Sequence, residues 1–410
     1  MRKKIITAAI LTSCAGATAA VAADIDVGAN TTVGGEVFAD FGRITLQNET
    51  GTGGAKVDSA PTGTGFDVKR FYLIVDHKFN NVWSADLTTD AQFSTASTTT
   101  VSTPGGGTAT ALTNQNTSGG VTEVMIKKLY LEGAFDKAFV LHIGAYTSPW
   151  APFVESVYGY RYVEKTSLDR LGFANTADWG INATGTFGQN LVNYSVSVVD
   201  GAGYKNPTRT KDVDVEGRVG VNATNWLTLG AGFYNGHLGQ ITAANENFPR
   251  NTATRYDFLA GIHIAGIHFG GEWYQAKNYK TVNSLAASTF GTSSIVNTAT
   301  VGPISDKATG FSSWLSYDFN AQWQVFSRYD DAKLSANVNP NLRDEYYNIG
   351  AVYKPIKPID IALVYKNEKV EHGNNSISGG DANGSYTIGG SSNGRYGWFS
   401  EYGVYVHWKF

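Results

Sequence analysis

The chain has 410 residues and a formal net charge of −3, with 16% charged residues, 13% aromatic residues and 47 glycines. An ordinary soluble domain carries about 25% charged residues, and the chain shows no basic stripe, so nucleic acid is not an expected partner. Beyond residue 24 there is no long apolar run of the kind that forms a transmembrane helix. The composition therefore favours one large β structure.

Residues 1–23 have the layout of a secretory signal peptide. RKK supplies positive charge, IITAAIL is a short apolar run, and ATAAVAA provides small residues before a cleavage site after Ala22 or Ala23. The segment is too short for a membrane-anchoring helix, and the apolar stretch before Cys14 is short for a lipoprotein signal. We expect export and a mature domain, 24–410, without cysteine, because Cys14 is the only one in the chain.

Strand-length segments with alternating apolar and polar residues recur from Val33 to Phe410. In DVDVEGRVGVN (212–222) the valines share one face and the charged residues share the other. VWSADLTTDAQF (82–93) and AFVLHIGAY (138–146) repeat the pattern. A period of two is typical of a strand whose faces meet different environments. The pattern predicts about sixteen strands in one uninterrupted domain.

Short and long connections alternate between these strands. The long ones are polar and rich in Gly, Ser, Thr and Asn, as in STASTTTVSTPGGGTATALTNQNTSGG and GNNSISGGDANGSYTIGGSSNG. The short turns are predicted at Asn80-Asn81, Asp136-Lys137, Gly188 to Asn190, Ala223 to Asn225, Ala265-Gly266, Asn320-Ala321 and Pro355 to Pro358. With an even number of strands, both chain ends fall on the short-turn side.

This asymmetry predicts a transmembrane antiparallel β-barrel with short periplasmic turns and long extracellular loops. Lipid offers no hydrogen bonds to the backbone, so a β protein can span it only when every strand edge is paired. Aromatic girdles are expected at both interfaces. The tryptophans near predicted strand ends are Trp83, Trp179, Trp226, Trp273, Trp323 and Trp408. A soluble sandwich or solenoid would not explain tight turns interleaved with long loops.

A barrel of about sixteen strands leaves an aqueous channel, whereas eight strands would be filled by side chains. The alternation predicts which charged residues face that channel. The basic ones are Arg70, Lys128, Arg218, Arg255, Arg328 and Lys366, and the acidic ones are Glu36, Asp40, Asp76, Asp86, Asp90, Glu132, Asp212, Asp214, Glu216, Asp257, Glu272 and Asp330. Such a mixed lumen with an acidic balance favours cations.

The loop from Thr147 to Thr176 is the candidate constriction. Its charged residues are Glu155, Arg161, Glu164, Lys165, Asp169 and Arg170, and its aromatic residues include Trp150, Phe153, Tyr158, Tyr160 and Tyr162. The other long loops are dominated by small polar residues, so this one is expected to fold inward and narrow the channel. The alternatives are an external loop with solvated charges, or an aromatic platform on which sugars stack.

Catalytic chemistry is not predicted, because the seven histidines are dispersed and no triad-like constellation emerges. The glycine-rich stretches lack the Lys-Ser/Thr ending of a phosphate loop, and no cofactor is expected. His263 and His268 would stand opposite each other across the turn at Ala265-Gly266. A hydrated polar pair is the default interpretation, and metal binding stays open because no further ligand is identified.

The last residues, Trp408 and Phe410, resemble the assembly signal of bacterial outer-membrane proteins, which ends in an aromatic residue with another aromatic two positions earlier. Gly403 lies earlier than the glycine expected in that signal. The resemblance implies recognition by the barrel-assembly machinery and residence in the outer membrane, in contact with lipid and lipopolysaccharide.

Three segments resemble the phosphate-selective porin O/P family: GFDVKRFYLIVDHKFNNVWSADLTTDAQF, IKKLYLEGAFDKAFVLHIGAYTSPWAPFVESVYGYRYVEKT and ADWGINATGTF. The shared features are an Arg-bearing strand, a tight turn, a second strand, an I-K-x-hydrophobic run, and a G-x-x-x-x-P loop start at Gly144 and Pro149. The motifs cover Gly65 to about Gly201. The resemblance implies a sixteen-stranded homotrimer with an inward-folded third loop.

We therefore expect a porin through which ions and small hydrophilic solutes diffuse passively, with anions such as phosphate among the candidates. The mixed lumen departs from the basic ladder of phosphate-specific members, so phosphate specificity does not follow. A surface adhesin or receptor barrel and a barrel enzyme are the alternatives from other classes.

Overall fold

The computed structural model describes residues 25–50, 54–94, 98–102, 108–112, 121–207, 209–243, 250–282, 304–381, 384–389 and 395–410. The predicted leader at 1–23 lies outside these residues.

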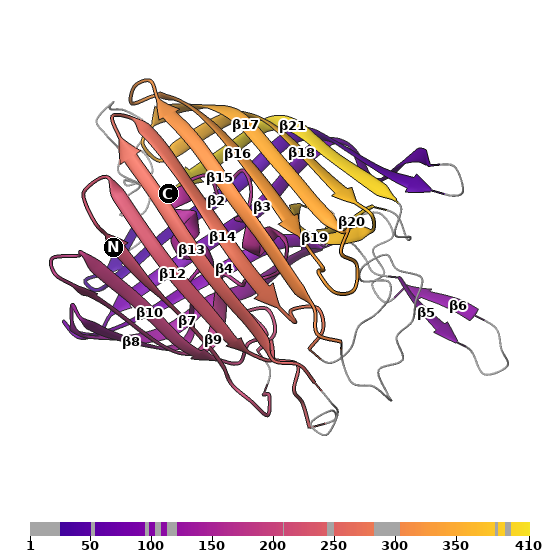
Figure 1. Cartoon of the computed structure of the whole chain (residues 1–410). Helices are drawn as coiled ribbons and strands as arrows, with labels where there is room; N and C mark the ends of the chain where they lie inside the picture. The colour runs from indigo at the N-terminus through magenta and orange to yellow at the C-terminus, as the bar shows by residue number, and fades with distance from the viewer. Residues whose placement is uncertain are drawn as a thin grey trace.

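Sixteen antiparallel strands form a sheet that closes on itself (Figure 1). They are β2 (Thr31–Thr50), β3 (Ala55–Lys78), β4 (Trp83–Ser94), β7 (Val121–Asp136), β8 (Phe139–Thr147), β9 (Ala177–Phe187), β10 (Val192–Val199), β11 (Asp214–Asn222), β12 (Leu227–Gly236), β13 (Ala253–Ile264), β14 (Ile267–Lys277), β15 (Lys307–Asp318), β16 (Trp323–Lys333), β17 (Arg343–Ile356), β18 (Ile359–Glu371) and β21 (Tyr396–Lys409). Each strand pairs with the next of these, and β21 returns to pair with β2, where Trp408 lies opposite Val37. The predicted barrel is confirmed.

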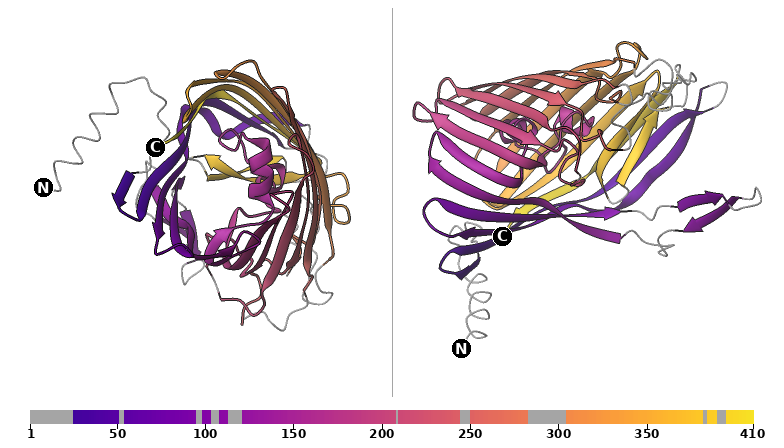
Figure 2. Two further views of the ribbon diagram at one scale, coloured as in Figure 1. Left: turned by 90° about the vertical axis from the view of Figure 1, so that its left-hand side faces the viewer. Right: turned by 90° about the horizontal axis from the view of Figure 1, so that it is seen from below.

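Besides these sixteen strands, the described residues form five further strands and two helices. β1 (Ile25–Gly28) pairs with the start of β2, and two hairpins are formed by β5 (Thr98–Ser102) with β6 (Thr108–Leu112) and by β19 (Asn374–Asp381) with β20 (Gly384–Gly389). The helices are α2 (Ala151–Tyr158) and α3 (Ser167–Arg170). Viewed along the barrel, α2, α3 and the β19–β20 hairpin lie inside the ring of strands (Figure 2). Among the described residues no helix combines the length and the apolar character needed to cross a membrane.

All seven predicted short turns join consecutive strands at one end of the barrel, which we call the short-turn rim. The turn between β13 and β14 shows why two residues suffice there. Ala265 and Gly266 both have positive φ, 51° and 79°, as in a two-residue hairpin turn whose twist matches that of the strands. The longer connections, including 148–176 and 200–213, leave the opposite end.

The outer face of the barrel is apolar and carries an aromatic belt near the short-turn rim. Exposed large side chains in that belt include Phe79, Phe135, Phe139, Phe187, Trp226, Phe319 and Trp323. Trp83 and Trp408 also lie at this rim, whereas Trp179 lies at the other end of its strand and Trp273 lies well inside β14. An aromatic ring with a polar tip suits the boundary between hydrocarbon and water.

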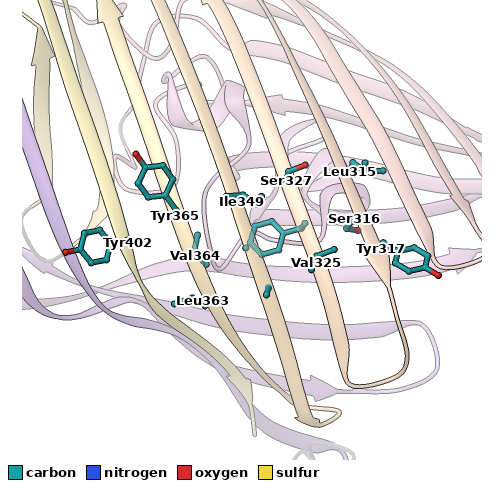
Figure 3. Close-up of a pocket in the computed structure, with 13 residues that line it drawn as sticks. Leu315, Ser316, Tyr317, Val325, Ser327, Ile349, Leu363, Val364, Tyr365 and Tyr402 are labelled. Atoms are coloured by element: carbon teal, nitrogen blue, oxygen red, sulfur yellow. The ribbon is translucent and has the colours of Figure 1, made fainter.

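A shallow apolar groove of about 600 Å³ crosses the outside of β15 to β18 and β21 (Figure 3). Small residues such as Ser327 and Ala351 form its floor, and Tyr365, Tyr402 and Leu363 border it. The groove belongs to the same apolar outer surface.

The seam between β2 and β21 is closed by the last residue. The N–H and C=O of Phe410 exchange hydrogen bonds of 3.0 and 2.9 Å with Gly35. The Phe410 ring covers Gly35 so closely that a Cβ at that position would lie 2.3 Å from it. Phe410 also stacks with Phe71 of β3 at 6.5 Å. Phe410 thus adds an aromatic contact across the strands that close the barrel.

Candidate functional site

The segment 148–176 folds into the barrel as a compact loop. Its base is closed by a hydrogen bond of 3.0 Å from the Ser148 N–H to the Thr176 carbonyl. Helix α2 begins with a proline in its first turn and ends at Gly159, whose φ of 83° turns the chain back. Trp150 and Leu168 are buried. The expected inward-folded loop is therefore present, and the burial of these apolar side chains contributes to its compactness.

Glycines on the inner face of β12 and β13 provide the space into which the loop packs. A Cβ on Gly232 would lie 2.5 Å from the Trp150 ring, and one on Gly230 would lie 2.4 Å from the Phe153 ring. A Cβ on Gly261 would lie 2.5 Å from Val157. The sequence of these strands is thus matched to α2, because any larger residue would displace the helix.

Arg170 joins the loop to the barrel wall through three carboxylates from three strands. Its guanidinium lies 2.5 Å from Glu368 Oε1, 2.9 Å from Asp344 Oδ1 and 3.4 Å from Asp330 Oδ2. Arg170 is 1% exposed and its guanidinium stacks over Tyr346. We call Arg170 and these three acids the latch. Burial alone would lower the pKa of Arg170, but the three carboxylates outweigh it and hold the pKa well above its usual range. Arg170 was expected to face the channel, and the structure instead places it behind the loop.

Three residues expected to line the pore also hold the loop. Arg328 donates to the Lys165 carbonyl at 2.5 Å, and Arg255 donates to the Phe173 carbonyl at 2.8 Å. Glu272 accepts a hydrogen bond of 2.8 Å from the Trp150 indole. Buried backbone carbonyls and indole N–H groups need such partners. Arg255, Arg328 and Glu272 lie on the inner face of the barrel, as predicted, but beneath the loop.

Glu164 forms a second attachment between the loop and the wall. Its Oε2 lies 3.3 Å from the Lys366 ammonium, which also lies 3.0 Å from Glu401 Oε2. Burial alone would raise the pKa of Glu164, but the positive charges of Lys366, Lys69 and Arg170 lower it to about 2. Glu164 is therefore ionised in the folded protein at any ordinary pH.

The opposite surface of the loop presents charges of both signs. Arg161 Nε lies 2.6 Å from Glu155 Oε1, and Arg161 Nη2 lies 3.7 Å from Asp169 Oδ2. All three side chains keep some exposure, between 13 and 18%. Burial lowers the pKa of Lys165 to about 8; Asp169 opposes that shift, and the positive charges of Arg70 and Arg161 add to it. The loop therefore brings Arg161 and Lys165 close to the wall that carries Arg70.

Two β-bulges place consecutive basic residues on the wall facing the loop. In β3, Arg70 pairs with Phe38 and Val68 pairs with Ala39, so Lys69 is the extra residue. In β7, Lys127 is extra in the same way, between partners of Thr88 and Thr89. A bulge breaks the alternation, so both neighbours can point inward. Lys127 accordingly donates to the Tyr72 hydroxyl at 2.9 Å.

Sequence reasoning missed Lys69 and Lys127 because it applied a strict period of two. Two adjacent basic residues, KR at 69–70 and KK at 127–128, were the available signal for a bulge in otherwise alternating strands. Lys69 lies 2.8 Å from Asp40 and 3.6 Å from Glu401. Its ammonium is therefore placed among inward-facing acids and not toward lipid.

The remaining predicted pore-lining residues also lie on the inner face. Lys128 is 3.7 Å from Asp86, Glu132 is 3.2 Å from His142, and Glu216 is 3.8 Å from Arg255. The Arg218 guanidinium lies 4.3 Å from the centre of the Phe153 ring, and Asp76 pairs in register with Asp86. Asp212 departs from the expectation, since it precedes β11 and lies beside His237 and Arg250 in the loops.

No protein-family model matches the sequence, and no curated protein matches it either. Solved structures match over nearly the whole chain. The anion-selective porin from Comamonas acidovorans superposes with a TM-score of 0.56 at 12% identity, covering 93% of this chain and 99% of that one. The outer-membrane channel DcaP of Acinetobacter baumannii superposes with a TM-score of 0.54 at 13% sequence identity, covering 93% of this chain and 99% of that one. Salmonella typhi OmpF superposes with a TM-score of 0.54 at 9% identity, covering 95% of this chain and 100% of that one. At such identities the similarity shows a common barrel fold. It does not single out the phosphate-selective porin O/P family.

Proposed function

We propose that this chain is an outer-membrane porin, a water-filled channel through which ions and small hydrophilic solutes diffuse without a bound energy source. The observation that supports it most is the closed barrel of sixteen strands with the loop 148–176 folded inside it (Figure 2). Barrels of this strand number have room for an aqueous path. The apolar outer face with its aromatic belt suits a membrane.

We infer that the path of a solute runs between the loop and the wall formed by β3 and β7, and we call this place the gap. Glu155, Arg161 and Asp169 belong to the loop, and Arg70 and Lys127 belong to the facing strands. Fixed charges of opposite sign around a narrow aqueous gap orient polar solutes and disfavour apolar ones. Aromatic residues expected as a sugar platform are largely buried against the wall, as Trp150 and Tyr158 are, which gives the charge-based gap the stronger support.

Selectivity for anions is the finer part of the proposal. Several acids that the alternation assigned to the lumen are engaged beneath the loop: Asp330 with Arg170, Asp257 with Arg255, and Glu272 with Trp150. Arg170 and Arg255 compensate the charges of Asp330 and Asp257, and Glu272 accepts a hydrogen bond from a neutral indole. Arg70, Lys127, Arg161 and Lys165 converge where the loop meets β3 and β7. This basic convergence supports a modest anion preference, with phosphate as one candidate.

The direct test is a planar bilayer recording of the refolded protein under a KCl gradient. Discrete conductance steps are expected, and the sign of the reversal potential should show that chloride permeates more readily than potassium. A cation-preferring potential would mean that the acidic lumen outweighs the basic residues at the gap. A folded barrel that produces no steps would overturn the channel proposal and favour the barrel-enzyme alternative.

Export and assembly remain proposals drawn from the sequence. We propose that 1–23 is removed on export, and that Trp408 and Phe410 are read by the barrel-assembly machinery before insertion among outer-membrane lipid and lipopolysaccharide. A homotrimer is proposed from the resemblance alone. Light scattering of the detergent-solubilised protein that gives the mass of a single folded chain would contradict the trimer.

A surface-binding role can coexist with a channel. The β5–β6 hairpin projects away from the barrel in the loop between β4 and β7 (Figure 1). Deleting the loop from Ser94 to Gly120 and measuring both cell adhesion and conductance separates the two roles. Lost adhesion with unchanged conductance would support the adhesin or receptor hypothesis, and unchanged adhesion would remove it.

A further inference from the structure

Two histidines face each other at the short-turn rim, on the inner side of the β13–β14 hairpin. His263 and His268 are direct cross-strand partners, and their rings stack with centroids 3.8 Å apart and an interplanar angle of 18°. Their neighbours Ile264, Ile267 and Phe269 are exposed on the outer face, so alternation directs both imidazoles inward. The two-residue turn between the strands fixes the spacing of the pair.

A carboxylate from the next strand completes a cluster. Asp318 is the last residue of β15, and its N–H donates to the Gly266 carbonyl at 2.8 Å, which ties it to the same hairpin. Asp318 Oδ2 lies 3.0 Å from His268 Nε2. One possible ligand atom from each of His263, His268 and Asp318 lies within 4.8 Å of the other two. Three strand ends therefore converge on one point.

The surroundings of Asp318 hold its carboxylate in place. The Gln324 side-chain amide of β16 donates to the other oxygen, Oδ1, while Oδ2 is directed to His268. Carboxylate ligands in metal sites are commonly oriented by such a hydrogen bond. The side chains of His268 and Asp318 are 29% and 35% exposed, so water can reach the cluster and complete a coordination sphere.

We propose that His263, His268 and Asp318 bind a divalent transition-metal ion of the Zn²⁺, Ni²⁺ or Cu²⁺ class. Two imidazole nitrogens and one carboxylate oxygen form the donor set that these ions prefer, whereas Mg²⁺ and Ca²⁺ prefer oxygen alone. The two rings stack with centroids 3.8 Å apart, so rotation of the side chains would bring one nitrogen of each ring to about 2.0–2.1 Å from one zinc ion, with water in the fourth position. The bound ion would place a positive charge at the short-turn rim and join three strands.

The test is isothermal titration of Zn²⁺ into the refolded, chelator-treated full chain in a zwitterionic detergent. One ion per chain is expected to bind. His263→Gln and His268→Gln should each weaken that site at least about 100-fold, because removing a direct ligand exceeds the 10–100-fold typical of losing an outer-shell partner. Asp318→Asn should weaken it less. The matched control is His142→Gln, since His142 is also an inward histidine 3.2 Å from a carboxylate, Glu132, but faces Tyr146 and not a second histidine.

Each outcome decides the proposal. Loss of the site in both histidine variants, with His142→Gln unchanged and all proteins showing the heat-modifiable migration of a folded barrel, establishes it. Equal binding by the wild type and the His263→Gln/His268→Gln double variant would overturn it, as would equal loss in His142→Gln. Because the readout is heat of binding, the result is independent of whether the barrel conducts ions.

Discussion

Replacing Arg170 with methionine should release the loop from the barrel wall. The substitution keeps much of the apolar volume but removes the guanidinium that Asp344 and Glu368 contact, leaving both acids buried without it, while Asp330 keeps its ion pair with Arg328 at 2.6 Å. Removing one partner of a buried ion pair costs about 3–5 kcal/mol. Since each 1.4 kcal/mol is about tenfold in an equilibrium constant, the ratio of docked to released loop should fall by about two to three and a half orders of magnitude.

The assay is single-channel conductance in a planar bilayer, with liposome swelling by sugars of increasing size as a second readout. Arg170→Met should give larger and noisier conductance steps and admit larger sugars, because the loop no longer stays at one position in the lumen. The barrel itself should fold, since the sixteen-strand ladder does not include Arg170. Heat-modifiable migration on a gel checks that condition.

Two controls separate the latch from a general effect of losing an arginine. Arg343→Met removes an arginine that pairs with Asp331 and Glu345 away from the loop, and it should leave conductance unchanged. Adding Asp344→Asn and Glu368→Gln to Arg170→Met removes uncompensated charge and should restore part of the wild-type behaviour. Wild-type conductance and size limit in a folded Arg170→Met protein would refute the assignment of Arg170 as the anchor of the loop.

Three further predictions concern the same loop. Arg161→Gln should shift the reversal potential toward cations while conductance changes little, because the basic side of the gap loses a charge that faces solute; an unchanged potential would place Arg161 outside the permeation path. Anion preference should decline as pH rises through about 8, because burial lowers the pKa of Lys165 to about 8, so that its side chain is charged below that pH and neutral above it. The reversal potential of Lys165→Met should not change with pH in this window. If it still changes with pH in that variant, another group causes the effect. Gly232→Ala should disturb loop docking, since the new Cβ would lie 2.5 Å from the Trp150 ring and overpacking costs about 1–3 kcal/mol; unchanged Trp fluorescence and conductance would show that α2 shifts without penalty.

The barrel could be predicted from the sequence alone. Period-two alternation predicts which residues face outward, and turn residues such as Asn80-Asn81 and Ala265-Gly266 indicate where strands end. Both signals depend only on residues that are neighbours in the chain. The same signals placed Arg218, Asp86 and Glu132 on the inner face, where the structure has them. The composition of 147–176 also set that loop apart from the others.

The roles of these groups depend on contacts between parts of the chain that lie far apart in the sequence. Arg170 meets Asp330, Asp344 and Glu368 across 160 to 198 residues of sequence, and no local pattern reports a contact at that separation. Arg170 and Asp330 were therefore predicted as separate channel-facing charges, and Asp344 and Glu368 were not singled out. Lys69 and Lys127 were hidden for a different reason: a bulge inserts one residue and reverses the parity on which the inward and outward assignment rests. Asp318 likewise joined the two histidines only when β15 was placed beside β14, because sheet neighbours are set by pairing and not by spacing along the chain.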